Sequence, residues 1–278
     1  MNTLKLISRT IKPGGFIKVI DVCPRVIPSE FINNLKCDYS IVEAARVSYS
    51  KGTKKVSDDA SLIKYLYSHE HTTPFEMVTF KFHIKAPLFV VRQWQRHRMS
   101  CFNEISGRYS VIENSFWYPE EFRKQAVINK QSSSDGIEYQ INQDLLYEYK
   151  LVATECYNFY DKLLNSGVSR EMARTILPLN TYTEFYWKID LHNLLRFIKL
   201  RNDKHAQEEI RLYAYELKKI VKEYCPVTMD AFENFTEKSI KFSNEELKII
   251  TKEENIESLK SKSGKADFIN KINKIKEY

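Results

Sequence analysis

The chain has 278 residues, of which 43 are Lys or Arg and 36 are Asp or Glu, so its formal net charge is +7. A hydrophobic content of 43%, with 13% aromatic residues, is enough for a buried core and excludes a wholly disordered chain. The 7 glycines form neither a G-x-G-x-x-G nor a G-x-x-x-x-G-K-[ST] motif, which excludes the two common glycine-rich phosphate loops. A nucleotide site in this chain would have to use cationic side chains and helix ends instead.

The first half of the chain is predicted to alternate between helices and strands. Apolar residues at helical spacing predict a helix over 57–68, with a capped start. Alternation of apolar and polar residues predicts a half-buried strand over 77–85. Pro87 is predicted to open a helix that continues through Arg98, and the polar stretch 99–109 is predicted to be an ordered loop.

The second half is predicted to be mainly helical. A Ser-rich stretch favours a flexible insertion at 124–140, and the aromatic and β-branched residues of 180–189 predict a second strand. Asp190 is a suitable N-cap for the helix that follows this strand. The spacing of apolar residues predicts helices over 142–166, from Ser169 to before Pro178, from Asp190 to about Arg201, and over 206–224.

The C-terminal residues differ in composition from the rest of the chain. Residues 236–278 contain 10 Lys against 8 Asp and Glu, so this stretch is dense in charge but nearly balanced. Ser243 and Glu246 have the spacing of a capping box, which predicts a helix after Ser243. We therefore expect one domain over 1–235 and a charged, helical C-terminal extension over 236–278.

The cysteines and the N-terminus favour a reducing, cytoplasmic compartment. The five cysteines form no C-x-x-C pair, and their odd number argues against a disulfide framework and a cysteine zinc site. The N-terminus lacks an apolar stretch of secretory length, and no run of 18 apolar residues occurs. These features favour a cytoplasmic protein that does not cross a membrane.

Arginines cluster in one short window. The window 92–108 contains Arg92, Arg96, Arg98 and Arg108 against the single Glu104, so its net charge is +3. Guanidinium groups bind phosphate through paired N–H donors, and the hydroxyl and amide groups of 103–109 could orient the rest of a ligand. This inventory suits a phosphate joined to a heterocycle. The alternative is a solvated basic face, although apolar residues on the same predicted helix indicate partial burial.

Two other groups of residues could carry chemistry. His69 and His71 could bind a metal ion, but no third ligand is evident nearby, so we predict no metal site. Arg201, Asp203 and His205 lie at the junction of two predicted helices. A cation at this junction could meet an anionic ring atom of a ligand. A salt bridge between the two helices would explain the presence of these charged residues equally well.

Residues 96–109, RHRMSCFNEISGRY, closely resemble the R-H-R-x-x-S-x-N-x-x-S-x-R-Y signature of flavin-dependent thymidylate synthases. Three more segments resemble motifs of that family in the same order: HTTPFE at 71–76, the arginine segment at 170–180, and LRNDKHAQEEI at 200–210. The resemblance covers roughly residues 15–235. Four ordered motifs are not a credible chance match, so a merely basic face is rejected for 92–109.

The resemblance implies an enzyme that makes thymidylate (dTMP) from deoxyuridylate (dUMP). The one-carbon donor would be methylenetetrahydrofolate, and FADH2, regenerated by NADPH, would be the reductant, with no covalent nucleophile from the enzyme. The implied fold is mixed α/β (α+β), the thymidylate synthase-complementing-protein-like fold, with a small antiparallel sheet surrounded by helices. The resemblance also implies a homotetramer whose active sites are shared between subunits, with no membrane and no specific nucleic acid as partners.

The resemblance further implies roles for individual residues. Arg201 would be the catalytic residue, which stabilises negative charge on the uracil ring of dUMP. The residues implied to bind dUMP are Gln93, Arg96, Glu104, Ser106, Gly107, Arg108, Arg174 and Arg201. The residues implied to bind FAD are Thr73, Arg96, His97, Arg98, Met99, Glu104, Asp190, His192 and Arg196. His71 matches a histidine near the flavin and the folate.

The chain departs from the family pattern at two of these positions. Cys101 stands where the signature has its first Ser, and Asp190 stands where relatives often carry Asn. We expect activity to survive, because Ser106 is kept. The alternative is a protein of the same fold that lacks activity and binds nucleotide or nucleic acid through its basic surface. The other class of thymidylate synthase would need an activated cysteine, for which Cys101 is the sole candidate.

Overall fold

The computed structural model describes residues 1–47, 58–126 and 133–276, and the chain separates into two compact units, Met1–Phe232 and Glu233–Tyr278. The first residue of the helix predicted over 57–68, and residues 127–132 of the predicted insertion, lie outside these ranges. Within them, no helix has the length and apolar character needed to span a membrane.

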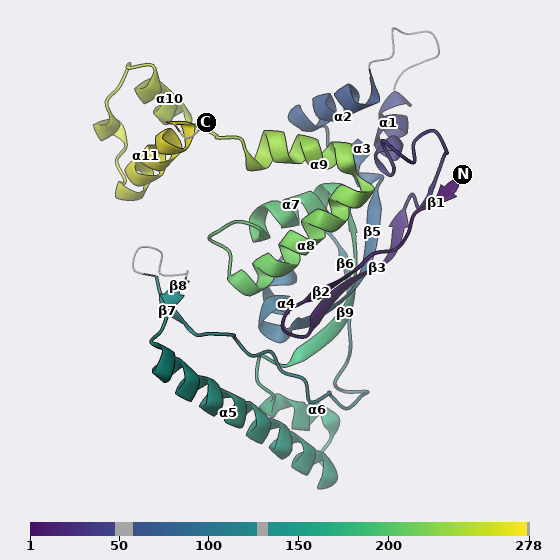
Figure 1. The fold of residues 1–278 in the computed structure, drawn as a ribbon, viewed down its shortest axis with the longest axis vertical. Coiled ribbons are helices and arrows are strands. Elements are labelled where there is room, and N and C mark those ends of the chain that lie inside the picture. Colours follow the sequence, from purple (N-terminus) through teal and green to yellow (C-terminus); the bar gives the residue numbers. More distant parts are fainter. Residues whose placement is uncertain (48–57, 127–132, 277–278) are drawn as a thin grey trace. The chain divides into compact units, whose positions relative to one another are not determined.

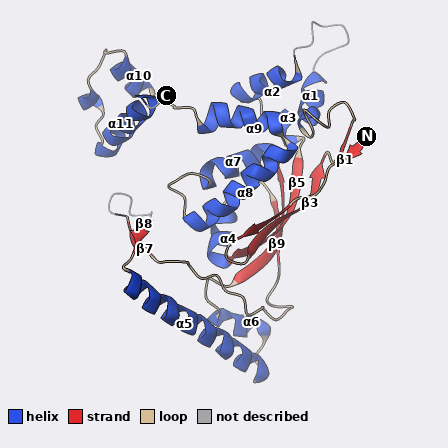
Figure 2. Cartoon of the chain, viewed as in Figure 1, coloured by secondary structure: helices blue, strands red, loops and turns tan. Residues whose placement is uncertain are grey.

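A five-stranded antiparallel sheet forms the centre of the first unit, in the order β2-β3-β5-β9-β6 (Figures 1 and 2). Its strands are β2 (Ser8–Ile11), β3 (Gly15–Cys23), β5 (Thr79–Pro87), β6 (Cys101–Glu104) and β9 (Tyr182–Asp190). Strands β5 and β9 pair along their whole length, from Thr79 opposite Asp190 to Pro87 opposite Tyr182. Because side chains alternate along each strand, one face of the sheet is apolar and buried and the other carries polar residues.

Helices cover the apolar face of this sheet (Figure 2). The three that position the site are α4 (Leu88–Trp94), α7 (Leu191–Arg201) and α8 (Glu208–Tyr224). Beneath them lies an aromatic cluster of Trp94, Trp187 and Phe197, which are fully buried and have ring centroids 4.7 to 5.1 Å apart. Such edge-to-face and tilted contacts give the core a defined packing at the point where strand β9 meets helices α4 and α7.

The remaining elements surround this centre. The other helices of the first unit are α1 (Asp38–Arg46), α2 (Asp59–Ser68), α3 (Thr73–Glu76), α5 (Tyr139–Asn165), α6 (Arg170–Ala173) and α9 (Pro226–Phe232), with a 3-10 turn at Arg174–Ile176. Two short strand pairs join β1 (Asn2–Thr3) to β4 (Val26–Ile27) and β7 (Arg123–Gln125) to β8 (Ser133–Gly136).

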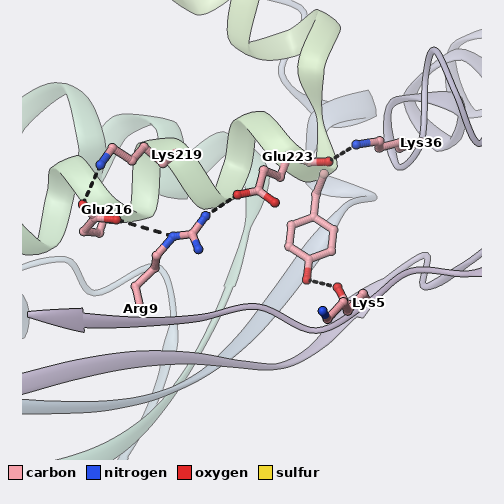
Figure 3. Close-up of polar contacts among 7 residues, drawn as sticks. Lys5, Arg9, Lys36, Glu216, Lys219 and Glu223 are labelled. Atoms are coloured by element: carbon pink, nitrogen blue, oxygen red, sulfur yellow. Dashed lines mark hydrogen bonds and ion pairs between the residues drawn. The ribbon is translucent and has the colours of Figure 1, made fainter.

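The C-terminal half of α8 is attached to the N-terminal part of the chain. Arg9 on β2 bridges two glutamates of this helix: its Nε lies 3.5 Å from Glu216, and its Nη2 donates to Glu223 (Figure 3). The Lys36 ammonium donates to the backbone carbonyl of Glu223 at 2.7 Å. A bridging guanidinium fixes two turns of one helix face at once, because its N–H groups are held in one plane.

The second unit is helical, as expected for the extension. It contains α10 (Asn244–Ile250), α11 (Lys262–Lys276) and two single turns, Glu233–Glu237 and Ile256–Ser258. The predicted capping box is confirmed: Ser243 accepts from the Glu246 amide and the Glu246 carboxylate accepts from the Ser243 amide. The Lys271 ammonium binds the same buried carboxylate at 2.7 Å, so Glu246 connects α10 to α11.

Most of the predicted elements are confirmed. Helices α2, α5, α7 and α8 and strands β5 and β9 lie within about two or three residues of the predicted bounds, as is usual for helix and strand ends. Asp190 is the N-cap of α7, and its carboxylate accepts from the Asn193 amide at 2.9 Å.

Two predictions around residue 98 are wrong. Helix α4 ends at Trp94 rather than Arg98, because the amides of Arg96 and His97 bond three residues back, to Gln93 and Trp94, in a tight turn. The stretch predicted as a loop over 99–109 contains the edge strand β6, which pairs with β9 from Cys101 opposite Lys188 to Glu104 opposite Phe185.

Candidate active site

The C-terminal ends of α4 and α7 bring three of the predicted site residues together. Arg201 closes α7, and its Nε donates to His97 Nε2 at 2.9 Å. Its Nη2 donates to the backbone carbonyl of Gln93 at 3.2 Å. The Gln93 side chain in turn donates to Gln207, the N-cap of α8, at 2.5 Å. Arg201 is therefore held by two acceptors in a fixed orientation, and among the described residues it does not form the interhelix salt bridge that the sequence also allowed.

The imidazole of His97 is neutral in this arrangement. Burial lowers its pKa to about 4, and the positive charges of Arg201 and Arg196 add to that effect. Because Nε2 accepts from Arg201, the ring proton lies on Nδ1. Burial also lowers the pKa of the Arg201 guanidinium, which stays charged because an arginine titrates far above neutral pH. The pair is thus a fixed cation supported by a neutral base.

A second group of predicted site residues lines a cavity of about 460 Å³. Four of them face it: Glu104, Ser106, Gly107 and Arg174. The Glu104 carboxylate is fixed from two sides, because it accepts from the Thr183 hydroxyl at 2.8 Å and from the Gln95 amide at 3.3 Å. Through Gln95, which follows α4 directly, Glu104 also connects the cavity to the first group of residues.

Gly107 is tightly packed in the cavity wall. It is buried, and a Cβ atom built on it would lie 2.7 Å from Ile112 Cδ1 and 3.2 Å from Arg174 Cδ. No larger residue fits there unless these side chains move. The neighbouring Arg108 is exposed and pairs with Glu171 at 3.2 Å.

The cavity also contains residues that the sequence analysis did not single out. Lys85 and Glu184 line it, and they are direct partners in the register of β5 and β9, with an ammonium-to-carboxylate distance of 3.8 Å. Glu184 binds His83 as well, at 2.8 Å. Only the strand alternation could have indicated these residues, and a single sequence does not specify which strand positions face each other.

A third group lies at the opposite end of the β5–β9 pair. Thr73 opens α3, and Asp190 and His192 lie where β9 passes into α7. Both carboxylate oxygens of Asp190 are occupied by Asn193, each at 2.9 Å. Strand β5 has 9 residues, so the two ends of the pair lie about 26 Å apart at about 3.3 Å per residue. The structure therefore does not bring this group to the cavity within one chain.

Three predicted flavin contacts, Arg96, Arg98 and Met99, lie on the exposed turn after α4. Across residues 1–47, 58–126 and 133–276, neither arginine forms an ion pair with an acidic side chain. Two exposed and uncompensated guanidinium groups on one turn are suited to an anionic ligand. Arg196, which is exposed on α7, adds a third positive charge near His97.

His69, His71 and Cys101 are the residues that the sequence offered for metal binding or nucleophilic chemistry. His69 and His71 have ring centroids 6.4 Å apart and surround the exposed Tyr65. Among the residues that the structure describes, no three His, Cys, Asp or Glu side chains are placed to hold a metal ion. Cys101 is exposed on the edge strand β6.

Comparisons with known proteins agree with the fold and the motifs. The family described as thymidylate synthase complementing protein matches residues 30–227. The flavin-dependent thymidylate synthase of Thermus thermophilus is 50% identical over 236 residues, which cover 85% of this chain and 82% of that protein. The flavin-dependent thymidylate synthase of Wolbachia pipientis is 45% identical over 259 residues, which cover 91% of this chain and 87% of that protein. The crystal structure of PolB, a UMP/dUMP methylase from Streptomyces cacaoi bound with 5-Br UMP, has a TM-score of 0.69 at 28% identity and covers 80% of this chain and 95% of its own.

The family match spans more than half of the chain, and both synthases are well above 30% identity over most of their length. The antiparallel sheet with its surrounding helices is the fold that the sequence motifs implied. The chain therefore belongs to the flavin-dependent thymidylate synthase family.

Proposed function

We propose that this chain converts dUMP to dTMP with Arg201 as the fixed cation at the uracil ring. Methylenetetrahydrofolate is the one-carbon donor, and NADPH regenerates the reduced flavin. The observation that carries the assignment of Arg201 is its anchoring by His97 Nε2 and the Gln93 carbonyl. A cation that is oriented before the substrate arrives stabilises developing negative charge without reorganising.

The residues present fit a flavin dinucleotide. Arg96 and Arg98 are exposed cations without acidic partners in the part of the chain that the structure describes, and they supply charge for a pyrophosphate where no glycine-rich loop exists. His97, kept neutral, and Met99 lie on the same turn. When bound, FAD supplies the hydride that reduces the transferred carbon. We assign Thr73, Asp190, His192 and Arg196 to the same cofactor, and His71 to the region between flavin and folate.

The cavity beside β6 suits the phosphate and sugar of dUMP. Arg174 provides a guanidinium group and Ser106 a hydroxyl in its lining, and we assign to the same phosphate the exposed Arg108, which follows Gly107 in the chain. Glu104, which is oriented by Thr183 and Gln95, accepts hydrogen bonds from a sugar hydroxyl. Gln93 and Arg96 complete the set at the end of α4.

The separation between the groups supports a homotetramer with shared sites. Glu184, a cavity residue on β9, precedes Asp190 by six positions, so the flavin residues near Asp190 lie about 20 Å from the cavity along the sheet at about 3.3 Å per residue. A neighbouring copy that presents its Asp190 end to this chain's cavity would close that gap. Several subunits would then contribute to each active site.

The proposal is tested first by the absorbance spectrum of the purified protein. We expect a yellow protein whose flavin absorbance is bleached by NADPH under anaerobic conditions, and dTMP on addition of dUMP and methylenetetrahydrofolate. Arg201→Ala should retain the flavin and lose turnover by about a hundredfold or more, the usual effect of removing an electrostatic stabiliser.

Two results would contradict this function. One is a colourless protein that FAD does not reconstitute. The other is salt-sensitive binding of DNA or RNA that survives replacement of Arg96 and Arg201, which would favour a nucleic-acid-binding protein of the same fold.

A further inference from the structure

Arg123 bridges two adjacent glutamates at the start of α8. It lies on β7, and its Nη1 donates to Glu208 and its Nη2 to Glu209, each at 2.6 Å. The preceding residue is fixed as well, because the Phe122 amide donates to the buried Asn142 of α5 at 2.8 Å. Residues 122–123 are thus attached both to α5 and to the first turn of α8.

Glu209 depends on this contact. Its side chain is only 6% exposed, and its Oε2 is buried with no hydrogen-bond partner among the described residues. Burial of a carboxylate is costly unless a cation pairs with it, and here Arg123 is the cation, through Oε1. Without Arg123, we expect the first turn of α8 to shift so that Glu209 reaches water.

The first turn of α8 is also one end of a hydrogen-bonded chain to the substrate site. Gln207, the N-cap of this helix, accepts from the Gln93 side chain at 2.5 Å. The backbone carbonyl of Gln93 accepts from Arg201. A shift of this turn therefore releases the Gln93 side-chain amide from Gln207, its one side-chain partner among the residues that the structure describes, close to the proposed catalytic cation.

We propose that Arg123 is a positioning residue for dUMP binding: it holds Glu208 and Glu209, and thereby fixes Gln207 against Gln93. The inference rests on the proposed function, because it takes Gln93 as part of the dUMP site. Arg123 contacts Glu208 and Glu209 rather than Gln93 and acts through Gln207.

Arg9 provides a matched control. It also bridges two glutamates of α8, Glu216 and Glu223, but it does so in the C-terminal half of the helix (Figure 3). The two arginines are similarly exposed, at 24% for Arg123 and 34% for Arg9. Arg123→Met and Arg9→Met each remove one bridging guanidinium from the same helix, and only Arg123→Met releases the end next to Gln207.

The test is the dissociation constant of dUMP, measured by calorimetry on the FAD-loaded protein. We expect Arg123→Met to weaken dUMP binding by about tenfold and Arg9→Met by less than about twofold, with similar losses of thermal stability in both. Flavin content and kcat at saturating dUMP should stay within about twofold of the original chain. Arg123→Lys, whose single ammonium cannot bridge both carboxylates, should give an intermediate value and serves if Arg123→Met does not fold.

A double-mutant cycle shows whether the effect passes through Gln207. In a Gln207→Ala background, Arg123→Met should weaken dUMP binding by less than about twofold. The inference is overturned if the tenfold effect persists in that background, if both arginine variants weaken dUMP equally, or if Arg123→Met has no effect while the original chain binds dUMP. If the original chain itself does not bind dUMP, the proposed function fails and the inference fails with it.

Discussion

The hydrogen bond from Arg201 to His97 determines how both side chains can be used. Its geometry requires an unprotonated Nε2, and burial together with two nearby arginines keeps the ring in that form. A protonated imidazole would repel Arg201 and break the contact. The orientation of the proposed catalytic cation therefore depends on the neutrality of its neighbour.

This dependence gives a prediction for pH. An NMR titration of His97 should have a midpoint near pH 4. The unfolded chain takes up this proton near pH 6.5, so the stability that neutral His97 contributes is present above 6.5 and is lost as pH falls toward 4. The ring is half-buried, so the loss should stay below about 1.4 kcal/mol per pH unit. His97→Asn should remove this part of the pH dependence, and a midpoint near 6.5 would contradict the assignment.

A second prediction concerns the wall of the cavity. Gly107→Ala places a methyl group against Ile112 Cδ1 and Arg174 Cδ, so we expect a loss of about 1–3 kcal/mol in the free energy of unfolding and weaker dUMP binding. Ile112→Val removes the nearest atom. The double variant should therefore recover part of both losses. Equal losses in the single and double variants would show that Ile112 is not the source of the conflict.

At this scale, the sequence motifs predicted which residues are present at the site but not how they are connected. Arg201 was predicted from its motif, whereas its partner His97 is 104 positions away. Lys85 and Glu184 were not predicted as cavity residues, because their meeting depends on the register of two strands far apart in the chain.

At the scale of elements, α7 leads from the Asp190 end of the sheet back toward α4. It begins at Asp190, where β9 ends opposite the start of β5, and it ends at Arg201 beside α4. Eleven residues at about 1.5 Å each carry the chain back by about 16 Å. The N-cap at Asp190 therefore affects the placement of Arg201 through the helix between them.

The cap can be tested separately from cofactor binding. We expect Asp190→Ala to lower the free energy of unfolding by about 1 kcal/mol, because the Asn193 amide loses its acceptor. Asp190→Asn keeps a side-chain oxygen and should lose less than half as much. Urea denaturation measures both, and equal losses for Ala and Asn would contradict the capping role.

Element boundaries were less predictable where packing competes with local pattern. The residues 95–98 continue a helical pattern in sequence, but the tight turn after Trp94 redirects the chain into β6. Besides Cys101, strand β6 has one apolar residue, Phe102, whose ring stacks on that of Phe185 with centroids 4.4 Å apart, so no alternating pattern marked the strand. Edge strands of this kind are specified by the neighbour they pair with rather than by their own residues.

At the scale of the whole molecule, the chain contains two compact units with separate cores. The first is built around the sheet, and the second around Phe242, Leu259 and Phe268 with the Glu246–Lys271 pair. The residues assigned to dUMP and FAD all belong to the first unit. Composition and the extent of the motifs predict a domain boundary at residue 235.

A truncated chain tests this division. Residues 1–235 alone should fold, bind FAD and keep turnover within about threefold of the full chain, since no assigned site residue is removed. Circular dichroism and flavin content measure folding and loading. Loss of flavin from a folded truncated protein would show that the extension takes part in the site.

The aromatic cluster under the site has a practical consequence for spectroscopy. Trp94 and Trp187, two of the three tryptophans, are fully buried next to Phe197, whose ring lies 4.7 Å from that of His97, while Trp117 is half-buried against Phe89. Buried indoles emit at shorter wavelengths than solvated ones. The intrinsic fluorescence of the flavin-free chain therefore reports on the floor of the active site, so that loosening beneath His97 can be observed as a red shift without a label.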